Sequence, residues 1–363
     1  MCLFCLETIK IVSLCSILIF FISKTVKFNN LSKTHTNIPI FIPELACPHQ
    51  CVFCNQMKIS GMPAIPSPNE IRNIIETHLK TIPKERTIQI AFFGGSFTGI
   101  PIDLQQKYLK EAFHYIEKKE VESIRISTRP DYINEEILIM LKKYGVKSIE
   151  LGAQSTDEYV LKKSGRGHSF SDIQNAAKLI KDYNFELGLQ MMIGLPGDTL
   201  EKSNETAHNI VNLKADNTRI YPTLVVKDTA LEIMFNQGKY KPLSLQEAIF
   251  QTKEIVKIFE SAKVNILRIG LHASEDLIEG KNLVAGPIHR SFKELVMTEF
   301  WFDILVDKLK NSQEKELGIT VNPSQYNFAI GYEGKNKKHF YNLGVNLKFK
   351  TNKLLEKFEI QIE

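Results

Sequence analysis

Short apolar segments alternate with longer helix-like segments along the first two thirds of this 363-residue chain. Apolar runs of strand length between helices are typical of a parallel sheet that is covered on both faces. The predicted strands are Ile38–Pro43, Thr87–Phe93, Glu122–Thr128, Lys147–Gly152, Glu186–Gly194 and Thr218–Val225. The predicted helices are Pro68–Ile82, Leu104–Lys118, Glu135–Tyr144, Phe170–Tyr183 and Thr199–Leu213. Repeated βα units of this kind close into an eight-fold barrel or stay open as a partial barrel.

The pattern changes beyond residue 230. Leu243–Ala262 and Arg290–Leu309 are predicted helices and Val264–Leu271 is a predicted strand, while the last fifty residues alternate polar and apolar positions as short strands do. We therefore expect three parts: an extension over residues 1–36, a main α/β domain over residues 37–230, and a smaller α+β region over residues 231–363.

Composition places the chain among soluble globular proteins, with 43% hydrophobic and 24% charged residues. The net charge of +5 is compatible with a nucleic-acid partner, but many enzymes carry a similar charge. Low cysteine use outside one short segment fits a reducing compartment, so we expect a cytoplasmic protein.

The N-terminal extension contains an uncharged, mostly apolar segment over residues 11–23. Its length suits the core of a signal peptide, but no small-residue cleavage site follows it. It is also shorter than the roughly 20 residues of a membrane-spanning helix. We expect a dispensable extension, with a membrane tether as the alternative; without a tether no membrane partner is expected.

Three cysteines, Cys47, Cys51 and Cys54, follow the first predicted strand with C-x3-C-x2-C spacing. Three thiolates can ligate three irons of a four-iron cluster and leave the fourth iron open. Structural zinc usually takes four ligands, and only His49 lies nearby. Disulfides are disfavoured because an odd number of thiols in one segment cannot pair. The spacing therefore predicts an iron–sulfur cluster with an open coordination position.

Other polar or glycine-rich motifs also follow predicted strands, at Gly94-Gly95, Ser127–Asp131, Glu150–Ser155 and Gly194–Gly197. In parallel βα proteins the carboxyl ends of the strands meet at one edge, where reactive groups gather. Strand alternation places Glu150, Gly152 and Gln154 on one face, which would be the barrel interior. A buried glutamate and glutamine need polar partners, from a cofactor or from an internal network.

The cysteine run, with Phe53 as the aromatic of C-x3-C-x-aromatic-C, resembles the signature of radical S-adenosylmethionine (SAM) enzymes. That resemblance implies a partial (β/α)6 radical SAM barrel with a smaller C-terminal α+β region. It also implies a [4Fe-4S] cluster on Cys47, Cys51 and Cys54 and SAM bound at the open iron. Reduced by a flavodoxin- or ferredoxin-type electron donor, the cluster would cleave SAM to a 5′-deoxyadenosyl radical.

The resemblance also implies contacts with SAM at the strand ends. Phe53 lies in the cluster loop, and Gly94, Gly95 and Ser96 match the place where the methionine amino group is held, although most of the superfamily has an acidic residue instead of Ser96. Ser127 matches a ribose contact, with a salt-bridged loop between Arg129 and Asp131 as the alternative. The remaining predicted cofactor contacts are Glu150, Gln154 (ribose), Arg166 (the SAM carboxylate), Gln190 (ribose) and Gly194 (the adenine turn).

The string Glu150–Ser155 resembles the branch that contains the oxygen-independent coproporphyrinogen oxidase and the Elongator catalytic subunit. The string Arg219–Thr229 is closer to the Elongator subunit and makes Tyr221 and Lys227 the candidate catalytic residues. A core tyrosine and a surface lysine are the alternative. In the Elongator subunit an acetyltransferase domain follows, and here the remaining chain is too short for one.

We therefore predict a radical SAM enzyme that acts in tRNA modification, with tRNA as a candidate partner. One alternative is a radical SAM enzyme on a small molecule such as a tetrapyrrole. Another is a haem-binding carrier of the same fold, with His272 and His289 as candidate ligands. Basic and aromatic residues alternate over Lys335–Tyr341 as they do in RNA-binding segments, although a solvated turn also explains them.

Overall fold

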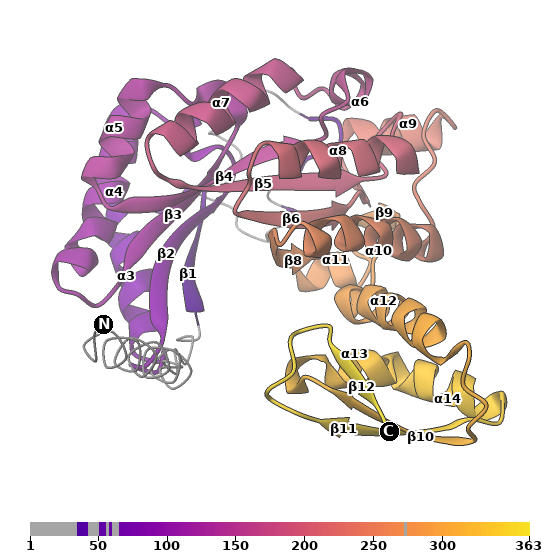
Figure 1. The fold of residues 1–363 in the computed structure, drawn as a ribbon. Helices are drawn as coiled ribbons and strands as arrows, with labels where there is room; N and C mark the ends of the chain where they lie inside the picture. Colours follow the sequence, from indigo (N-terminus) through magenta and orange to yellow (C-terminus); the bar gives the residue numbers. More distant parts are fainter. Residues whose placement is uncertain (1–34, 43–50, 56–57, 60–64, 272–273) are drawn as a thin grey trace, which may run out of the picture.

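The main sheet has seven parallel strands in the order β1-β2-β3-β4-β5-β6-β8 and curls into a partial barrel (Figure 1). The computed structural model describes residues 35–42, 51–55, 58–59, 65–271 and 274–363. The strands are β1 (His35–Ile42), β2 (Thr87–Gly94), β3 (Ser123–Thr128), β4 (Val146–Gln154), β5 (Glu186–Ile193), β6 (Asn217–Pro222) and β8 (Asn265–Ile269). The predicted partial barrel is confirmed, and β8, from beyond residue 230, extends the main sheet.

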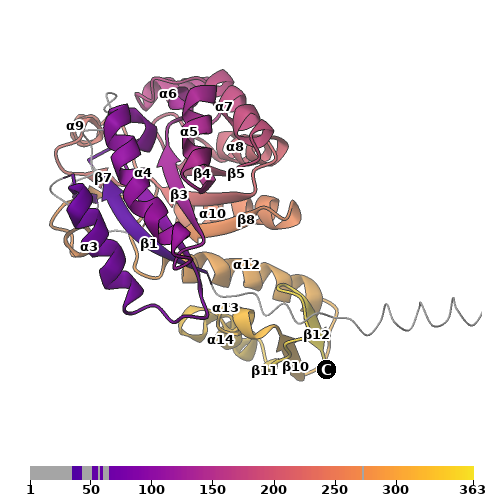
Figure 2. The same cartoon turned by 90° about the vertical axis from the view of Figure 1, so that its left-hand side faces the viewer.

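Helices follow the strands and cover the outer face of the sheet (Figure 2). They are α3 (Pro68–Leu79), α4 (Ile102–Glu117), α5 (Glu135–Lys143), α7 (Phe170–Asp182), α8 (Leu200–Asn212) and α10 (Leu245–Ser261). Ser67, Ser169 and Ser244 each begin a helix with a reciprocal capping box, which satisfies backbone N–H groups that the first helical turn leaves free. Three shorter helices were not predicted: α6 (Glu158–Lys163), α9 (Ala230–Asn236) and α11 (Glu275–Ile278).

The two faces of the sheet differ in chemistry, and the expectation that helices cover both of them is wrong. On the outer face Ile38, Ile40 and Ile42 of β1 are at most 1% exposed beneath the helices. On the inner face of the same strand, Asn37, Pro39 and Phe41 line a cavity. Side chains of a strand alternate between its faces, so each strand supplies the core and the cavity in turn.

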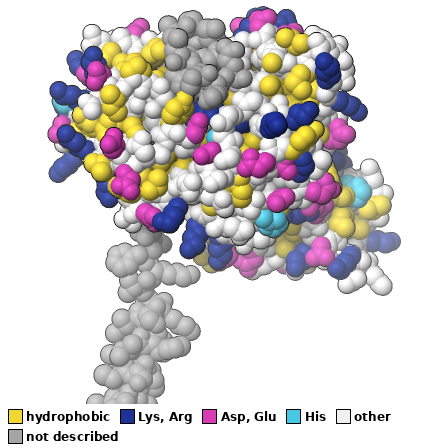
Figure 3. Space-filling model, turned by 90° about the horizontal axis from the view of Figure 1, so that it is seen from above, with side chains coloured by type: hydrophobic (Ala, Val, Ile, Leu, Met, Phe, Trp, Pro, Cys, Tyr) yellow, Lys and Arg dark blue, Asp and Glu magenta, His cyan; other side chains and the backbone are white. Residues whose placement is uncertain are grey.

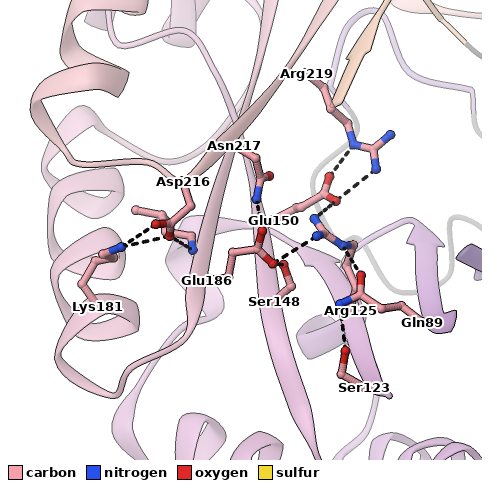
Figure 4. Close-up of polar contacts among 11 residues, drawn as sticks. Gln89, Ser123, Arg125, Ser148, Glu150, Lys181, Glu186, Asp216, Asn217 and Arg219 are labelled. Carbon is pink, nitrogen blue, oxygen red and sulfur yellow. Dashed lines mark hydrogen bonds and ion pairs between the residues drawn. The ribbon is translucent and has the colours of Figure 1, made fainter. Parts of the chain in front are cut away.

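A buried charge network crosses the inner face on the amino-terminal side of the cavity (Figure 4). Glu150 of β4, which is 2% exposed, accepts from Arg125 Nη1 of β3 at 2.7 Å and from Arg219 Nη2 of β6 at 3.0 Å. Arg125 also donates to Glu186 of β5 at 3.1 Å. A Cβ at Gly188 would lie 2.7 Å from Glu150 Cγ, so glycine there makes room for the carboxylate.

The C-terminal region contains a long helix and a second, smaller sheet. Helix α12 (Phe292–Leu309) packs against α10, α13 (Tyr326–Ile330) and α14 (Lys335–Asn342). The small sheet has the order β11-β10-β12, with β10 (Glu316–Val321), β11 (Asn346–Thr351) and β12 (Ile360–Ile362). The prediction of short strands is therefore right in part, because α13 and α14 were missed, and the turn expected over Lys335–Tyr341 is a helix.

A separate two-stranded ladder joins β7 (Val225–Val226) to β9 (Leu283–Ala285). The strand predicted to continue through Val225 ends at Pro222 instead. Proline lacks the N–H that would extend the ladder of β6, which explains the break. Among the described residues no helix is long and apolar enough to cross a membrane, and the apolar segment over residues 11–23 lies outside them.

The replacement Glu150→Gln is expected to lower the free energy of unfolding by about 3 kcal/mol, because it leaves Arg125 and Arg219 buried without their shared carboxylate. Urea unfolding of the cofactor-free protein measures this. Glu122→Gln is the matched control, because Glu122 forms an exposed ion pair with Lys147 and its loss should cost less than about 1 kcal/mol. Equal effects of the two replacements would contradict a structural role for the network.

Candidate active site

A cavity of about 530 Å³ opens on the inner face, at the carboxyl ends of the parallel strands. Every strand of the main sheet contributes to it, from Asn37 on β1 to Arg268 on β8. Carboxyl ends of parallel strands are where ligand sites form in βα proteins. Of the predicted cofactor-binding and catalytic residues, nine line this cavity: Phe53, Gly94, Gly95, Ser96, Ser127, Gln154, Arg166, Gln190 and Tyr221.

Two of the three predicted metal ligands, Cys51 and Cys54, line the same cavity, and Cys47 lies outside the described residues. The loop is fixed by its backbone, because Val52 N donates to Ser164 O at 3.1 Å and Leu231 N donates to Val52 O at 2.7 Å. Within the described part of the chain no group of three or more metal-ligating side chains is assembled. A complete metal site there would need Cys47.

Arg166 connects the cysteine loop to β4. It is 6% exposed, its Nη1 donates to Cys51 Sγ at 3.0 Å, and its Nη2 donates to the carbonyl of Gly152. Its Nε is buried without a hydrogen-bond partner among the described residues. A buried N–H of this kind is costly unless a ligand accepts from it. The guanidinium of Arg166 is therefore fixed in place, and its Nε–H remains available to a ligand.

Gln154 ends β4 in a strained conformation. Its φ is +67°, where residues other than glycine are uncommon, and the register with β5 shifts between Gly152 and Gln154. The side chain is 6% exposed and its Oε1 has no partner among the described residues. Strain combined with an unmet buried acceptor is typical of a ligand-binding position.

The glycine pair after β2 brings the backbone close to β1. Gly94 has a φ of +108°, and a Cβ there would lie 2.4 Å from the carbonyl oxygen of Ile42. Gly95 N donates to that same oxygen at 2.8 Å. Only glycine allows this approach, which anchors the turn at the cavity wall.

Hydroxyl groups join the ends of β2 and β3. Ser96 Oγ lies 2.7 Å from Thr128 Oγ1 and accepts from Arg129 N at 3.2 Å. Arg129 forms a bidentate pair with Asp131, with both bonds at 2.9 Å, and also donates to the carbonyl of Arg166 at 2.6 Å. The salt-bridged loop considered as the alternative is therefore present, and Ser127 beside it still lines the cavity.

The cavity wall at β6 is polar and buried. Burial opposes the charge of Arg219, but attraction and hydrogen bonds from Glu150 outweigh it and raise the pKa of the guanidinium. Burial raises the pKa of Tyr221, so its phenol stays protonated at neutral pH. Burial lowers the pKa of Arg268, and the neighbouring charge of Arg219 adds to this.

Three predicted site residues do not line the cavity. Glu150 lies beneath it with its carboxylate bound by two arginines, so the internal network accounts for its burial. Gly194 lines a separate cavity of about 260 Å³, where its carbonyl accepts from Tyr240 Oη at 2.6 Å. Lys227 is exposed, and its backbone N–H donates to Asn282 O at 3.0 Å. The surface-lysine alternative describes Lys227 better than the catalytic one.

Sequence reasoning missed several residues of the cavity, among them Asn37, Met192, Arg219 and Arg268. Asn37 Oδ1 is buried without a partner among the described residues. The alternation that identified Gln154 on β4 also places Asn37 on the inner face of β1, so the signal was present. For Arg268 no such signal existed, because the sequence did not reveal that β8 joins the main sheet.

A neutral histidine lies next to Arg129 and Arg166, two of the arginines that line the cavity. His168 is 7% exposed, and burial, reinforced by Arg166 and Arg129, lowers its pKa to about 3. Between pH 6.5 and 3 the unfolded chain binds a proton that the folded protein does not, so stability falls as the pH falls. From pH 6.5 to 5 we expect His168→Asn to remove about 1.5 kcal/mol of this loss, measured by urea unfolding. Parallel pH curves for the two proteins would contradict it.

Two family models match the chain. The model of the Radical SAM superfamily matches residues 42–210, and the model of the Radical_SAM C-terminal domain matches residues 215–301. An uncharacterized protein from Methanocaldococcus jannaschii is 33% identical over 229 residues, covering 58% of this chain and 68% of that protein.

Relatives with functional names include an acetyltransferase and a heme chaperone. The tRNA uridine(34) acetyltransferase of Methanocaldococcus infernus is 28% identical over 243 residues, 56% of this chain and 46% of that protein. The heme chaperone HemW of Bacillus subtilis is 25% identical over 253 residues, 65% of each chain. This chain thus spans about half the length of the acetyltransferase relative.

A solved structure shares the fold. The archaeal Elp3 of Methanocaldococcus infernus, determined with an N-terminal deletion, aligns with a TM-score of 0.59 at 22% identity, covering 76% of this chain and 64% of that one. Both family models and the arrangement of the sheet agree with the cysteine motif. The chain therefore belongs to the radical SAM superfamily and is an enzyme of the radical SAM type.

Proposed function

We propose that this chain is a radical SAM enzyme of tRNA modification. The observation that carries the chemistry is the convergence of Cys51, Cys54, Arg166 and Gln154 on one cavity at the carboxyl edge of the sheet. The relative named tRNA uridine(34) acetyltransferase supports tRNA as the substrate class. Because the match covers less than half of that relative, the reaction on tRNA need not be the same.

The residues present fit a [4Fe-4S] cluster and SAM. Thiolates are the usual ligands of iron–sulfur clusters, and Cys51 and Cys54 lie at the cavity with Cys47 completing the motif. Three buried polar atoms at the cavity lack partners among the described residues: Asn37 Oδ1, Gln154 Oε1 and Arg166 Nε. An amino-acid head group and a ribose offer the donors and acceptors that these atoms need. When bound and reduced, the cluster supplies the electron that cleaves SAM to a 5′-deoxyadenosyl radical.

The side chains at the cavity would hold and orient the cofactor. Arg166, fixed between Cys51 and Gly152, would hold the SAM carboxylate. The turn at Gly94, Gly95 and Ser96 offers backbone carbonyl and hydroxyl acceptors to the amino group. Gln154 and Gln190 line the cavity from the adjacent strands β4 and β5 and would hold the ribose, and Ser127 lines it from β3 on the other side of β4.

Tyr221 remains the candidate catalytic residue on the substrate side. Its raised pKa keeps the phenol neutral, so it can donate a hydrogen bond or a hydrogen atom but does not act as a base at neutral pH.

A haem-binding carrier is the second candidate, because HemW matches 65% of the chain. The histidine contacts do not favour it. His289 packs edge-on against Tyr332 at 5.8 Å between ring centroids, and its Nδ1 accepts from Ser291 N at 3.0 Å. His272 lies outside the described residues. A Soret band on adding haem that His289→Ala abolishes would favour the carrier.

Anaerobic reconstitution should yield about four irons per chain, and reduction in the presence of SAM should release 5′-deoxyadenosine. Cys51→Ala and Cys54→Ala should each lose most of the iron, because the cluster then lacks one of its three thiolates. Cys15→Ala, outside the motif, is the matched control and should load iron fully. Folded wild-type protein without iron and without 5′-deoxyadenosine would contradict the proposal.

Mass spectrometry of tRNA nucleosides tests the substrate class. Cells that lack the chain should lose or accumulate one modified nucleoside, and expression of the wild type should restore the pattern. Expression of Cys51→Ala should not, because the radical chemistry is lost while the fold remains. Identical nucleosides in all three strains, with active 5′-deoxyadenosine formation in vitro, would favour a small-molecule substrate instead.

A further inference from the structure

The unit formed by residues 316–363 lies apart from the cavity. Of the described residues that line the cavity, none comes from this unit, and the two family models end before it, at residues 210 and 301. Its elements follow the order β10, α13, α14, β11, β12 (Figure 1). Strands β10 and β11 pair in parallel, so the two short helices form the crossover between them.

The turn between the two helices is Gly331-Tyr332-Glu333-Gly334. KH modules use a G-x-x-G loop of this kind to hold the backbone of about four nucleotides of single-stranded RNA. Both glycines have positive φ, +88° at Gly331 and +76° at Gly334. This likeness to KH modules is one of local arrangement, and the chemistry of the turn decides what it can bind.

The two glycines play different parts. At Gly331 a Cβ would lie 2.8 Å from Asn336 N and 3.0 Å from Thr298 Cγ2, so glycine is required by packing. At Gly334 a Cβ would meet a single described atom within 4 Å, Lys338 Cε at 3.7 Å. The outer side of Gly334 is therefore open, and a ligand can reach the backbone there.

Positive charge gathers beside the open glycine. Lys337 and Lys338 are exposed, and the described residues form no ion pair with either of them, whereas Lys335 pairs with Glu299. With Glu333 the segment 331–341 carries three lysines and one acid, a net charge of +2. The first turn of α14 contains no acidic residue, and no side chain caps it. Lysines around a free helix N-terminus favour a phosphate.

Aromatic surface accompanies this charge. Tyr341 is 67% exposed at the end of α14, where a base can stack on its ring. On the face shown in Figure 3, basic and acidic side chains are interspersed, so that face does not attract a polyanion broadly.

The turn is connected to the cavity wall through a short linker. Tyr332 packs edge-on against His289, whose ring centroid lies 5.8 Å away. Three residues earlier, Gly286 lies so close to Leu224 that a Cβ there would be 3.1 Å from its Cα, and Leu224 lines the cavity. Three residues of chain span at most about 10 Å. A single-stranded RNA bound at the turn can therefore place a neighbouring nucleotide near the cavity.

We propose that the Gly331–Gly334 turn, together with Lys337 and Lys338, binds the sugar–phosphate backbone of single-stranded RNA. The proposal rests on the proposed function for the identity of the RNA, and it adds a docking site outside the radical SAM barrel. Lysine side chains and exposed backbone groups contact phosphates and therefore give affinity without base specificity. The turn thus holds the RNA, while the cavity selects the base.

A pair of isosteric variants tests the turn. The full-length protein without cofactors is titrated against a fluorescent 12-nucleotide single-stranded RNA, followed by anisotropy. Gly334→Asn and Gly334→Asp both tolerate positive φ and both can cap α14, so they should fold alike, as their melting temperatures will show. The carboxylate of Gly334→Asp repels phosphate and competes for Lys338, so we expect at least tenfold weaker binding than for Gly334→Asn. Equal affinity of the two variants would overturn the proposal.

Salt dependence gives a second measure. Lys337→Gln/Lys338→Gln should reduce the slope of log K against log salt by about 1.4, because each phosphate contact on a single strand contributes about 0.7. Lys107→Gln/Lys110→Gln is the matched control, since both lysines are exposed on α4 without ion pairs among the described residues. An unchanged slope for the first variant, or equal losses for both, would refute the assignment.

Two further measurements distinguish failure of the proposed RNA-docking site from failure of the proposed radical SAM activity. Tighter binding of DNA of the same sequence, or of duplex RNA, would overturn the assignment to single-stranded RNA. Release of 5′-deoxyadenosine from SAM without RNA is measured on the reconstituted Gly334→Asp protein and should equal that of the wild type. A wild-type protein that forms 5′-deoxyadenosine but binds no RNA refutes the docking site alone.

Discussion

One buried carboxylate organises the inner face of the sheet. Glu150 joins β3, β4 and β6 through Arg125 and Arg219, and a carboxylate at 2% exposure needs such partners to offset the hydration that it loses on burial. Gly188 makes room for it, since any side chain there would collide with the carboxylate. The network fills the interior below the cavity, so the space above it stays open to a ligand.

Above this network, residues with unfavourable conformations or unmet hydrogen bonds lie at the carboxyl edge of the sheet. Gln154 has a strained backbone and an unmet acceptor, and Arg166 is buried with one N–H unmet by any described residue. Neither is explained by packing alone, and both line the cavity that contains Cys51 and Cys54. Backbone strain and buried polar atoms without partners are unfavourable in the free protein, and binding a polar cofactor at this edge would offset their cost.

Much of the fold and part of the candidate site could be predicted from local sequence signals. Apolar runs and their spacing located the first six strands and the main helices, because this pattern depends on neighbouring residues. Alternation correctly put Glu150 and Gln154 on the inner face, but it could not show that Arg125 and Arg219 would engage Glu150. The same limit applies to Gly194, whose turn was recognised although the side on which it opens depends on Tyr240 and Leu243. The C-terminal helices escaped prediction because α13 and α14 have five and eight residues, too few for a clear period.

The sequence by itself determined the βα order, the cysteine motif and the family, since each is written in contiguous residues. Only the tertiary structure decided which residues share the cavity, because strands distant in sequence bring them together. Arg268 reaches the cavity because β8 pairs with β6, whereas Lys227 directly follows β7 and is exposed outside the cavity, although Leu224 and Val226 line it. The G-x-x-G turn is visible as four letters, but its place between two helices, with Tyr332 against His289, follows from packing of the C-terminal unit on the linker beside the cavity.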